Sequence, residues 1–446
     1  MFLALNPLLA RKKPFFLPLV KNKRRHPVLF EGEKRRQMIK KLKSREILDS
    51  RGNPTVETQI ETPEGIFYGM APSGASTGSS EALELRDGGR RLYGKGVLKA
   101  VSNVNKLIAP LLAGHDPREQ IYLDEMMVAL DGTPNKKRLG ANAMVSVSIA
   151  LCKAGAAKKG VPTFQHISKL AGTFPRMPMP LSNLINGGKH AGIENDFQEH
   201  MVAPVGARDF PSAMEMIAST FHSLSALLKK KGVNTSLVAD EGGFVFGKAP
   251  GERLQMLRQA AEESGVENKV ALALDCAATE YFHNGKYYAG GMRTAQEISK
   301  YYQKIVSDFG VFSIEDPFAE EDWPAWINFT KTNKKLQVVG DDLLTTNPER
   351  IAKAVRLRAC NALLIKPNQI GTVSETISAF KLAKKAKWST IVSHRSGETE
   401  DAFAAHLVVG LGCGQCKFGA PDRGERTAKY NELLRICEKV KTFGVV

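Results

Sequence analysis

The second half of the chain contains short apolar runs that each end in a polar residue suited to chemistry. The last residues of consecutive runs are 40, 26, 25, 27 and 24 positions apart, close to one strand, one helix and two turns. Short continuous apolar runs are typical of parallel strands buried on both faces, so the spacing predicts consecutive βα units. The runs end at Asp275, Glu315, Asp341, Lys366, Ser393 and Lys417.

These units predict a closed α/β barrel, in which the carboxyl ends of the strands present their side chains at one mouth. Three prolines at 175, 178 and 180 indicate a domain boundary, and we expect the barrel at 176–446. Upstream, 39–70 reads as an antiparallel strand meander and 81–170 has helical periodicity. We therefore expect an α+β domain at 38–175.

Residues 1–37 differ from everything that follows. They contain ten lysines and arginines against two glutamates, which is +8 of the formal net charge of +17, and they show no hydrophobic period. Three interpretations stay open: a spurious or alternative upstream start, a disordered basic arm, and an organelle-targeting segment. A basic arm suggests contact with nucleic acid, although no motif supports it.

The composition favours an ordinary soluble globular protein, with 43% hydrophobic and 24% charged residues in 446. No apolar stretch approaches the roughly 20 residues of a membrane span. The six cysteines are spread thinly, which favours a reducing compartment, and we expect the cytoplasm. Cys413 and Cys416 have CxxC spacing, but no second pair accompanies them, so we expect neither a metal nor a redox role there.

The predicted barrel mouth combines carboxylates with a lysine. Asp275, Glu315 and Asp341 are hard oxygen ligands without histidine or cysteine, and this set favours Mg²⁺ over zinc. Any one of these three carboxylates alone is more often a helix cap, but three of them at strand ends in register favour a metal site. Lys366 precedes Pro367, which ends the strand there. A cation beside Lys366 would lower its pKa and allow it to act as a base.

Other segments add groups for an anionic substrate. His394, Arg395 and Ser396 follow an apolar run and suit a phosphate or carboxylate, although a polar loop capping a helix is the plainer alternative. Glu241 follows an apolar stretch and is expected at a strand end, and either it or Glu199 can act as a general acid if its pKa is raised. Residues 73–79 are small and hydroxylated, which suggests a lid.

Taken together, these segments resemble the enolase family of phosphopyruvate hydratases over about residues 39 to 440. The matches occur in order: REILDSRGNPTVE, SGASTG, EALELRDG, NGGKHAG, DEGG, LDCAATE, SIEDPFAEEDW, DDLLTTNPERI, KPNQIGT, SHRSGETED and AKYNELLRI. The resemblance implies an α+β cap followed by a modified (β/α)8 barrel of ββαα(βα)6 order. It also implies a homodimer or higher homo-oligomer that uses two Mg²⁺ ions.

The implied reaction is the reversible dehydration of 2-phospho-D-glycerate to phosphoenolpyruvate in glycolysis and gluconeogenesis. Lys366 would remove the C2 proton and Glu241 would assist departure of the C3 hydroxyl, while two Mg²⁺ ions stabilise the enediolate. A lysine base with Mg²⁺ is the pattern for which the enolase superfamily is a standard example. Asp275, Glu315 and Asp341 would hold the first metal.

The remaining roles also follow from the resemblance. Ser76 on the lid would help to hold the second Mg²⁺, which arrives with the substrate. Lys417 would face the substrate carboxylate with Gln198 and Glu199 nearby, and Glu199, Lys417 and His394 would join the catalytic residues. The groups expected around the phosphate and leaving group are His190, His394, Arg395 and Ser396.

Several positions depart from the usual family pattern. Ser80 stands where histidine or tyrosine is frequent, His200 where an apolar residue is usual, Gly412 where arginine is usual, and Phe418 where threonine is usual. None of these is a transferred catalytic residue, but Ser80 and Phe418 affect the expected lid and pocket. Two rivals stay open: a superfamily relative that acts on another carboxylate, and a noncatalytic binding protein.

Overall fold

The computed structural model describes residues 38–444. The expectations for residues 1–37 therefore lie outside the described residues. Within 38–444, no helix is both long and apolar enough to cross a membrane.

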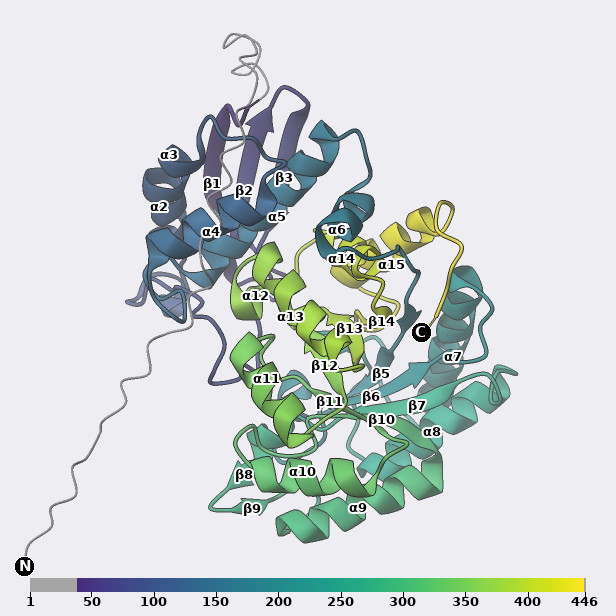
Figure 1. Ribbon diagram of the computed structural model, residues 1–446. Coiled ribbons are helices and arrows are strands. Elements are labelled where there is room, and N and C mark those ends of the chain that lie inside the picture. The colour runs from purple at the N-terminus through teal and green to yellow at the C-terminus, as the bar shows by residue number, and fades with distance from the viewer. Residues whose placement is uncertain (1–37, 445–446) are drawn as a thin grey trace, which may run out of the picture. The chain divides into compact units, whose positions relative to one another are not determined.

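The chain begins with a three-stranded antiparallel sheet of order β1-β2-β3, formed by β1 (Lys41–Leu48), β2 (Pro54–Thr62) and β3 (Gly65–Met70). The helices that follow are α2 (Leu98–Asn103), α3 (Ala109–Leu112), α4 (Gln120–Asp131), α5 (Ala141–Lys158) and α6 (Thr163–Ala171). Helix α5 packs against β2 and β3 (Figure 1). Val56 and Ile60 from the sheet share a buried core with Met144 and Val147 from α5.

The prediction of helix from residue 81 was wrong up to residue 97, where only the short 3₁₀ helix Arg91–Gly94 forms. Residues 81–90 are irregular because their polar side chains make tertiary contacts. Asp87, for example, accepts hydrogen bonds from the backbone N–H groups of Leu98 and Lys99 at 2.9 and 2.8 Å, which caps the start of α2. The regular helices begin only at Leu98.

The rest of the chain forms a closed barrel of strands surrounded by helices (Figure 1). Its sheet has the order β4-β14-β13-β12-β11-β10-β7-β6-β5. Strands β4 (Met179–Pro180) and β5 (Ser182–Asn186) are separated by Leu181 alone, and the Leu181 N–H donates to the Cys416 carbonyl at 2.7 Å. This continuous segment joins the two ends of the sheet.

The order of elements confirms the ββαα(βα)6 fold class. The opening elements are β5, β6 (Glu199–Ala203), α7 (Phe210–Lys230) and α8 (Pro250–Glu263). Strand β6 runs antiparallel to both neighbours, and the later strands pair in parallel. The six βα units are formed by β7 (Ala271–Asp275) and α9 (Ala295–Phe309), β10 (Val311–Glu315) and α10 (Trp323–Thr332), β11 (Gln337–Gly340) and α11 (Pro348–Leu357), β12 (Ala362–Ile365) with α12 (Pro367–Ile370) and α13 (Val373–Lys385), β13 (Ser389–Ser393) and α14 (Phe403–Leu411), and β14 (Gly414–Lys417) and α15 (Gly424–Ile436). Between β7 and α9, β8 (Phe282–His283) and β9 (Lys286–Tyr287) form a separate two-stranded sheet.

Side-chain alternation along the strands separates two buried layers. A small cluster that includes Met201, Ala273, Val339, Leu364 and Ile391 fills the inside of the barrel. Because successive strand side chains alternate between faces, the residue two positions nearer the mouth on each strand points the same way. That residue follows the cluster residue on the parallel strands, as Asp275 follows Ala273, and precedes it on the antiparallel β6, where Glu199 precedes Met201. The strands therefore direct polar side chains into the mouth and apolar ones below it.

Recognisable capping residues begin or end several of the helices. Thr294 and Glu297 form a reciprocal capping box at the start of α9, and Gly310 ends that helix with a φ of 65°. Gly412 ends α14 in the same left-handed conformation, with a φ of 64°. Gly412, which stands where arginine is usual in the family, therefore caps the carboxyl end of α14.

Candidate active site

The strand register brings the predicted residues to the same end of the barrel. Glu315 lies beside Asp275, and Ser393 lies beside Lys417, each pair at the carboxyl ends of neighbouring parallel strands. Glu199 lies opposite Asp275, because β6 is antiparallel and its first residue therefore reaches the mouth. Glu199, which lies outside the regular βα series, thus joins the residues of that series at the barrel mouth.

Lys417 is at the centre of one acidic group. Its Nζ lies 2.8 Å from Glu315 Oε1, 3.0 Å from Asp275 Oδ2 and 3.3 Å from both carboxylate oxygens of Glu199. Burial would lower the pKa of Lys417, but Asp275, followed by Glu199 and Glu315, outweighs it and raises the pKa well above its usual range. The ammonium group thus stays charged and balances the buried carboxylates.

Lys366 forms a second buried ion pair. Its Nζ lies 2.5 Å from Asp341 Oδ2, and the Gln369 side-chain amide donates to Asp341 Oδ1 at 2.9 Å. The expectation that a cation lowers the pKa of Lys366 stays a prediction. Burial would lower that pKa, but the negative charge of Asp341 outweighs it and raises the pKa.

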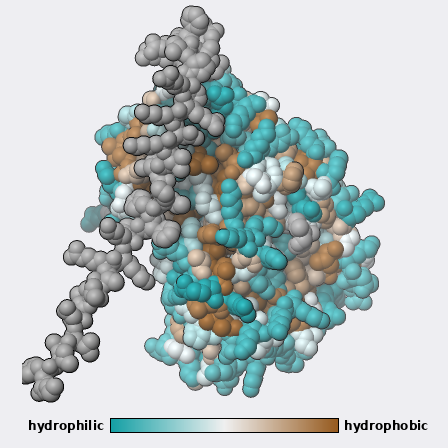
Figure 2. Space-filling view, in the orientation of Figure 1, coloured by the Kyte–Doolittle hydropathy of each residue, from teal (hydrophilic) through white to brown (hydrophobic). Residues whose placement is uncertain are grey.

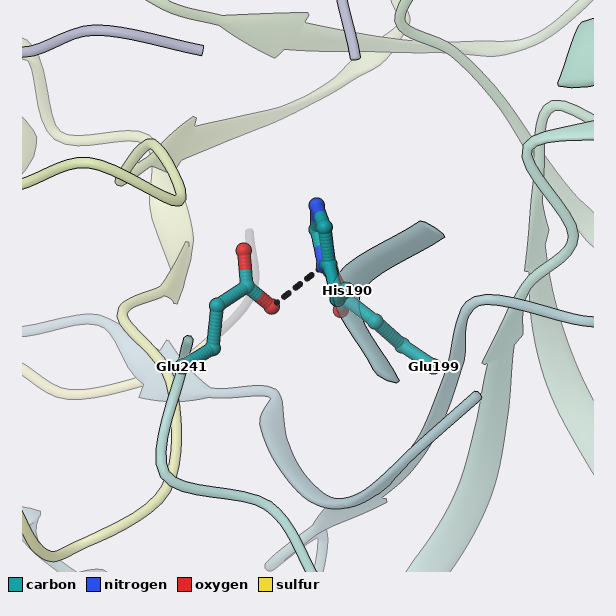
Figure 3. Close-up of side chains that lie close together, drawn as sticks. All are labelled: His190, Glu199 and Glu241. Atoms are coloured by element: carbon teal, nitrogen blue, oxygen red, sulfur yellow. Dashed lines mark ion pairs between the residues drawn. The ribbon is translucent and has the colours of Figure 1, made fainter. Parts of the chain in front are cut away.

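Glu241 lies between two histidines. Its Oε2 is 3.2 Å from His190 Nδ1, the contact drawn in Figure 3, and its Oε1 is 3.5 Å from His394 Nε2. Arg426 lies 2.8 Å from His394 Nδ1 and can only donate, so a neutral His394 carries its proton on Nε2, facing Glu241. Burial lowers the pKa of His394 well below its usual range.

The expected strand before Glu241 does not form. Val238 forms only an isolated bridge with Phe244, and Phe244 forms a second isolated bridge with Ile185 of β5. The Phe244 N–H donates to the Leu184 carbonyl at 2.9 Å, which holds this turn against the barrel. Glu241 therefore reaches the mouth from a turn and not from a strand end.

Glu199 and Glu241 have pKa values shifted in opposite directions. Burial and then the negative charge of Glu241 raise the pKa of Glu199 well above its usual range. Burial would also raise the pKa of Glu241, but His190 and then His394 outweigh it and hold the pKa well below the usual range. The environments of the two carboxyls thus separate their pKa values, the arrangement expected for acid and base roles.

The lid segment is held against the loop after β13. Arg395 forms a bidentate ion pair with Glu81, with N–O distances of 3.0 and 3.1 Å, and also donates to the Ser76 carbonyl at 3.1 Å. Ser396 Oγ accepts from the Ala75 N–H at 2.6 Å. The predicted anion-binding residues and the predicted lid are therefore in direct contact.

A single small cavity, of about 10 Å³, collects most of the predicted residues. Glu315 and Asp341 do not line it, and they join it through their ion pairs with Lys417 and Lys366. Gln198 Oε1 is buried without a hydrogen-bond partner, so an acceptor is available near the cavity. Its lining is Ser76, His190, Gln198, Glu199, Glu241, Asp275, Lys366, Ser393, His394, Arg395, Ser396 and Lys417.

The donor chemistry fits a divalent cation. Asp275, Glu315 and Asp341 are buried at neighbouring strand ends and offer only carboxylate oxygens. They are not among the groups, within 38–444, whose ligand atoms all lie within 4.8 Å of one another. Those groups are His190, Glu199 and Glu241, and Asp316, Asp341 and Asp342. Lys417 and Lys366 each hold part of the predicted trio, which explains its wider spacing.

Sequence reasoning did not single out several residues that shape the site. Glu81 and Arg426 hold Arg395 and His394, Gln369 holds Asp341, and Asn183 donates to Glu241 Oε2 at 2.9 Å. Glu81 lies two residues after the predicted lid, and this position in the sequence could have identified it as part of the site. Arg426 lies on α15, and only the folded chain brings it to the mouth.

The remaining sequence features have structural explanations. Ser80 Oγ accepts from Arg350 at 3.0 Å, and Phe418 is buried with its ring centroid 6.2 Å from that of Tyr430. Cys413 and Cys416 are buried and free, and burial raises the pKa of the Cys413 thiol to about 12. Such thiols are unreactive near neutral pH.

Comparison with known proteins decides the family. Residues 39–167 match the model described as Enolase, N-terminal domain, and residues 175–445 match Enolase, C-terminal TIM barrel domain. The chain belongs to the enolase family. An enolase of Solanum lycopersicum is 49% identical over 428 residues, which cover 91% of this chain and 96% of the relative. An enolase of Mastigamoeba balamuthi is 48% identical over 420 residues, with 90% and 96% covered. Enolase-family membership thus agrees with the barrel and with the residues collected at its mouth.

Proposed function

We propose that this chain is a phosphopyruvate hydratase that interconverts 2-phosphoglycerate and phosphoenolpyruvate. The observation that carries the proposal is one buried cavity into which Lys366, Lys417 and Arg395 bring positive charge beside two glutamates, Glu199 and Glu241, whose pKa values are shifted in opposite directions. A dianionic intermediate requires positive charge that is already in place, and buried cations are most effective for that purpose.

Lys366 is the proposed base for the C2 proton. Its Nζ borders the cavity and is held by Asp341 at the end of β11. Bound Mg²⁺ would supply positive charge that offsets Asp341 and the substrate carboxylate, and so bring the pKa of Lys366 toward the working range. Asp275, Glu315 and Asp341 are the proposed ligands of one ion, and Ser76 contributes to the second.

Glu199 and Glu241 are the proposed acid pair for the C3 hydroxyl. The pKa of Glu199 is raised and that of Glu241 is lowered, and Glu241 accepts a hydrogen bond from Asn183. Because the two carboxyls are close enough to titrate together, the proton belongs to the pair and not to one residue. Departure of hydroxide as water takes that proton.

The substrate's two anionic ends have distinct proposed partners. Lys417 faces the carboxylate, with Gln198 beside it. Arg395 and Ser396 bind the phosphate, since a guanidinium fork matches phosphate oxygens and already holds the Glu81 carboxylate in that geometry. His190 and His394 complete the leaving-group side.

The assembly and boundaries are also proposals. Exposed apolar side chains on β1 and β3, such as Leu48 and Ile66, support a homodimer or higher homo-oligomer, and patches of apolar residues are visible in Figure 2. We place the domain boundary at 175/176, in the irregular segment between α6 and β4. The cytoplasm, where glycolysis runs, is the proposed compartment.

The decisive experiment is a direct assay. Purified protein with 2-phosphoglycerate and Mg²⁺ should generate the ultraviolet absorbance of an enol phosphate. A related carboxylate without the phosphate should not react, because Arg395 and Ser396 would have no anion to bind. Folded protein that gives no signal with 2-phosphoglycerate would refute the proposal.

A further inference from the structure

One buried guanidinium bridges the two loops that deliver His190 and Glu241. Arg253 on α8 is only 1% exposed, and its Nη1 donates to Asp196 Oδ2 at 2.6 Å. Its Nη2 donates to the Phe246 carbonyl at 3.2 Å. Asp196 lies in the loop between β5 and β6 that carries His190, and Phe246 lies in the segment between α7 and α8 that carries Glu241. Arg253 therefore ties the two segments together.

The same two segments meet at the cavity, where His190 Nδ1 lies 3.2 Å from Glu241 Oε2 (Figure 3). We propose that Arg253 is a positioning residue that sets the geometry of this His190–Glu241 pair. This inference rests on the proposed function, and it concerns the departure of the C3 hydroxyl. Arg253 does not line the cavity itself, so it acts through the loops.

The ion pair is seated directly against the backbone at the base of the loop. A Cβ on Gly187 would lie 2.6 Å from Asp196 Oδ2 and 2.7 Å from Arg253 Nη1. The Gly187 N–H donates to the Gln198 carbonyl at 2.9 Å, which closes the loop at that point. A shift of the ion pair would therefore move the backbone that leads to His190 and Gln198.

The local electrostatics make the pairing strongly favoured. Arg253 is always charged, and removing its partner would leave a buried charge uncompensated. His200 lies nearby on the outer face of β6 and remains neutral, because burial and then the positive charge of Arg253 lower its pKa well below the usual range. His200 therefore does not compete with Arg253 for Asp196.

The proton-abstraction side of the cavity is held by different contacts. Lys366 follows β12 and is fixed by Asp341 and by the Thr346 hydroxyl, which accepts from its backbone N–H at 3.0 Å. Loss of the Arg253 bridge should thus displace the leaving-group residues more than it displaces the base. A misplacement of about 1 Å can lower a rate on the order of 100-fold.

The test compares Arg253→Leu with Arg258→Leu, an exposed arginine on the same helix. With 2-phosphoglycerate and Mg²⁺ in D₂O, phosphoenolpyruvate formation and deuterium exchange at C2 are measured together. For Arg253→Leu we expect kcat for dehydration to fall on the order of 100-fold, with the ratio of exchange to dehydration rising at least about tenfold. Arg258→Leu should match the wild type in both.

Asp196→Asn provides a second variant in case Arg253→Leu does not fold. This variant removes the negative charge of Asp196, the loop partner of Arg253. The ratio of C2 exchange to dehydration should rise in this variant as well. Arg253→Lys retains the charge without the two-pronged fork and should restore part of the dehydration rate. A parallel fall of both rates in folded variants would overturn the inference.

The wild type separates this inference from the proposed function. If it forms no phosphoenolpyruvate, the proposed function fails, and the bridge is then judged by amide hydrogen exchange in residues 187–197. Exchange there should be faster in Arg253→Leu or Asp196→Asn than in Arg258→Leu. Equal exchange would overturn the bridge independently of any activity.

Discussion

Glu199, the first residue of β6, lies directly opposite Asp275, the last residue of β7, and both carboxylates contact the ammonium group of Lys417. The antiparallel pairing makes this possible, since the start of one strand meets the end of the next. Three buried carboxylates, those of Glu199, Asp275 and Glu315, therefore share one lysine. Much of the site's stability should depend on that single positive charge.

Replacing this lysine tests the charge balance. Lys417→Met should destabilise the metal-free protein by about 3–5 kcal/mol, because it leaves buried carboxylates without a partner. Mg²⁺ should restore part of the loss by supplying positive charge to the same group. Urea unfolding with chelator and with Mg²⁺ measures the difference, and Lys229→Met on α7 is an exposed control. An equal loss in both conditions would contradict this account.

Removal of metal from the wild type should abolish activity without unfolding the protein. Lys417 and Lys366 already form ion pairs with the proposed metal ligands, so we expect the fold not to require the ion. We expect full recovery of activity on adding Mg²⁺, and stabilisation by about 2.7 kcal/mol when free Mg²⁺ is a hundred times its Kd. Circular dichroism and activity of the chelated protein check this, and irreversible unfolding would contradict it.

Lys366→Met should lower both dehydration and C2 exchange by about 10²–10⁴-fold or more, since the proposed base is lost. Metal binding, followed by calorimetry, should persist, because Asp341 keeps its carboxylate. Exchange in D₂O followed by NMR gives the decisive reading. Lys381→Met on α13 is exposed and serves as the matched control. Exchange that survives in Lys366→Met would assign the base to another group.

The regular strand ends were predictable because parallel barrel strands repeat one pattern of buried apolar residues. Asp275, Glu315, Asp341, Lys366 and Lys417 could all be placed at one mouth from their spacing alone. The regular spacing of the strands predicted a barrel mouth, but it did not predict the contacts between the side chains at that mouth. The pairing of each lysine with particular carboxylates depends on side-chain positions that spacing does not determine.

The residues outside the period were harder to place for physical reasons. Glu199 reaches the mouth only because β6 is antiparallel, and Glu241 reaches it from a turn that forms no strand. The irregular segment 81–90 was misread as helix because its polar side chains satisfy distant backbone groups. Arg253 has no local signature, because its partners Asp196 and Phe246 are brought to it by the fold.

The buried His200 should reduce stability. Its ring faces the backbone of Ile185 without a hydrogen bond of normal geometry at either nitrogen. His200→Leu should stabilise the protein by about 1–2 kcal/mol at neutral pH, because an unsatisfied buried polar group is removed. Unfolding in urea measures this, with the exposed His222→Leu on α7 as control. Clear destabilisation would show that the ring makes a favourable contact.

Asp124 should produce a measurable dependence of stability on pH. It is buried on α4, where its Oδ2 accepts from the Ser374 N–H and hydroxyl of α13 at 3.0 and 2.6 Å. Burial raises its pKa from 3.8 to about 6. Between these values the native state retains a proton that the unfolded chain has released, so stability falls as pH rises through this window, and the loss is complete above the folded pKa.

Asp124→Asn removes this titration. The wild type should lose about 2 kcal/mol more than the variant between pH 4 and pH 7, since one unit of pKa shift corresponds to about 1.4 kcal/mol and part of the loss already lies below pH 4. Unfolding free energies measured at several pH values give the two curves. Glu125→Gln on the same helix is an exposed control and should keep the wild-type slope. Parallel curves for the wild type and Asp124→Asn would show that Asp124 titrates equally in the folded and unfolded chain.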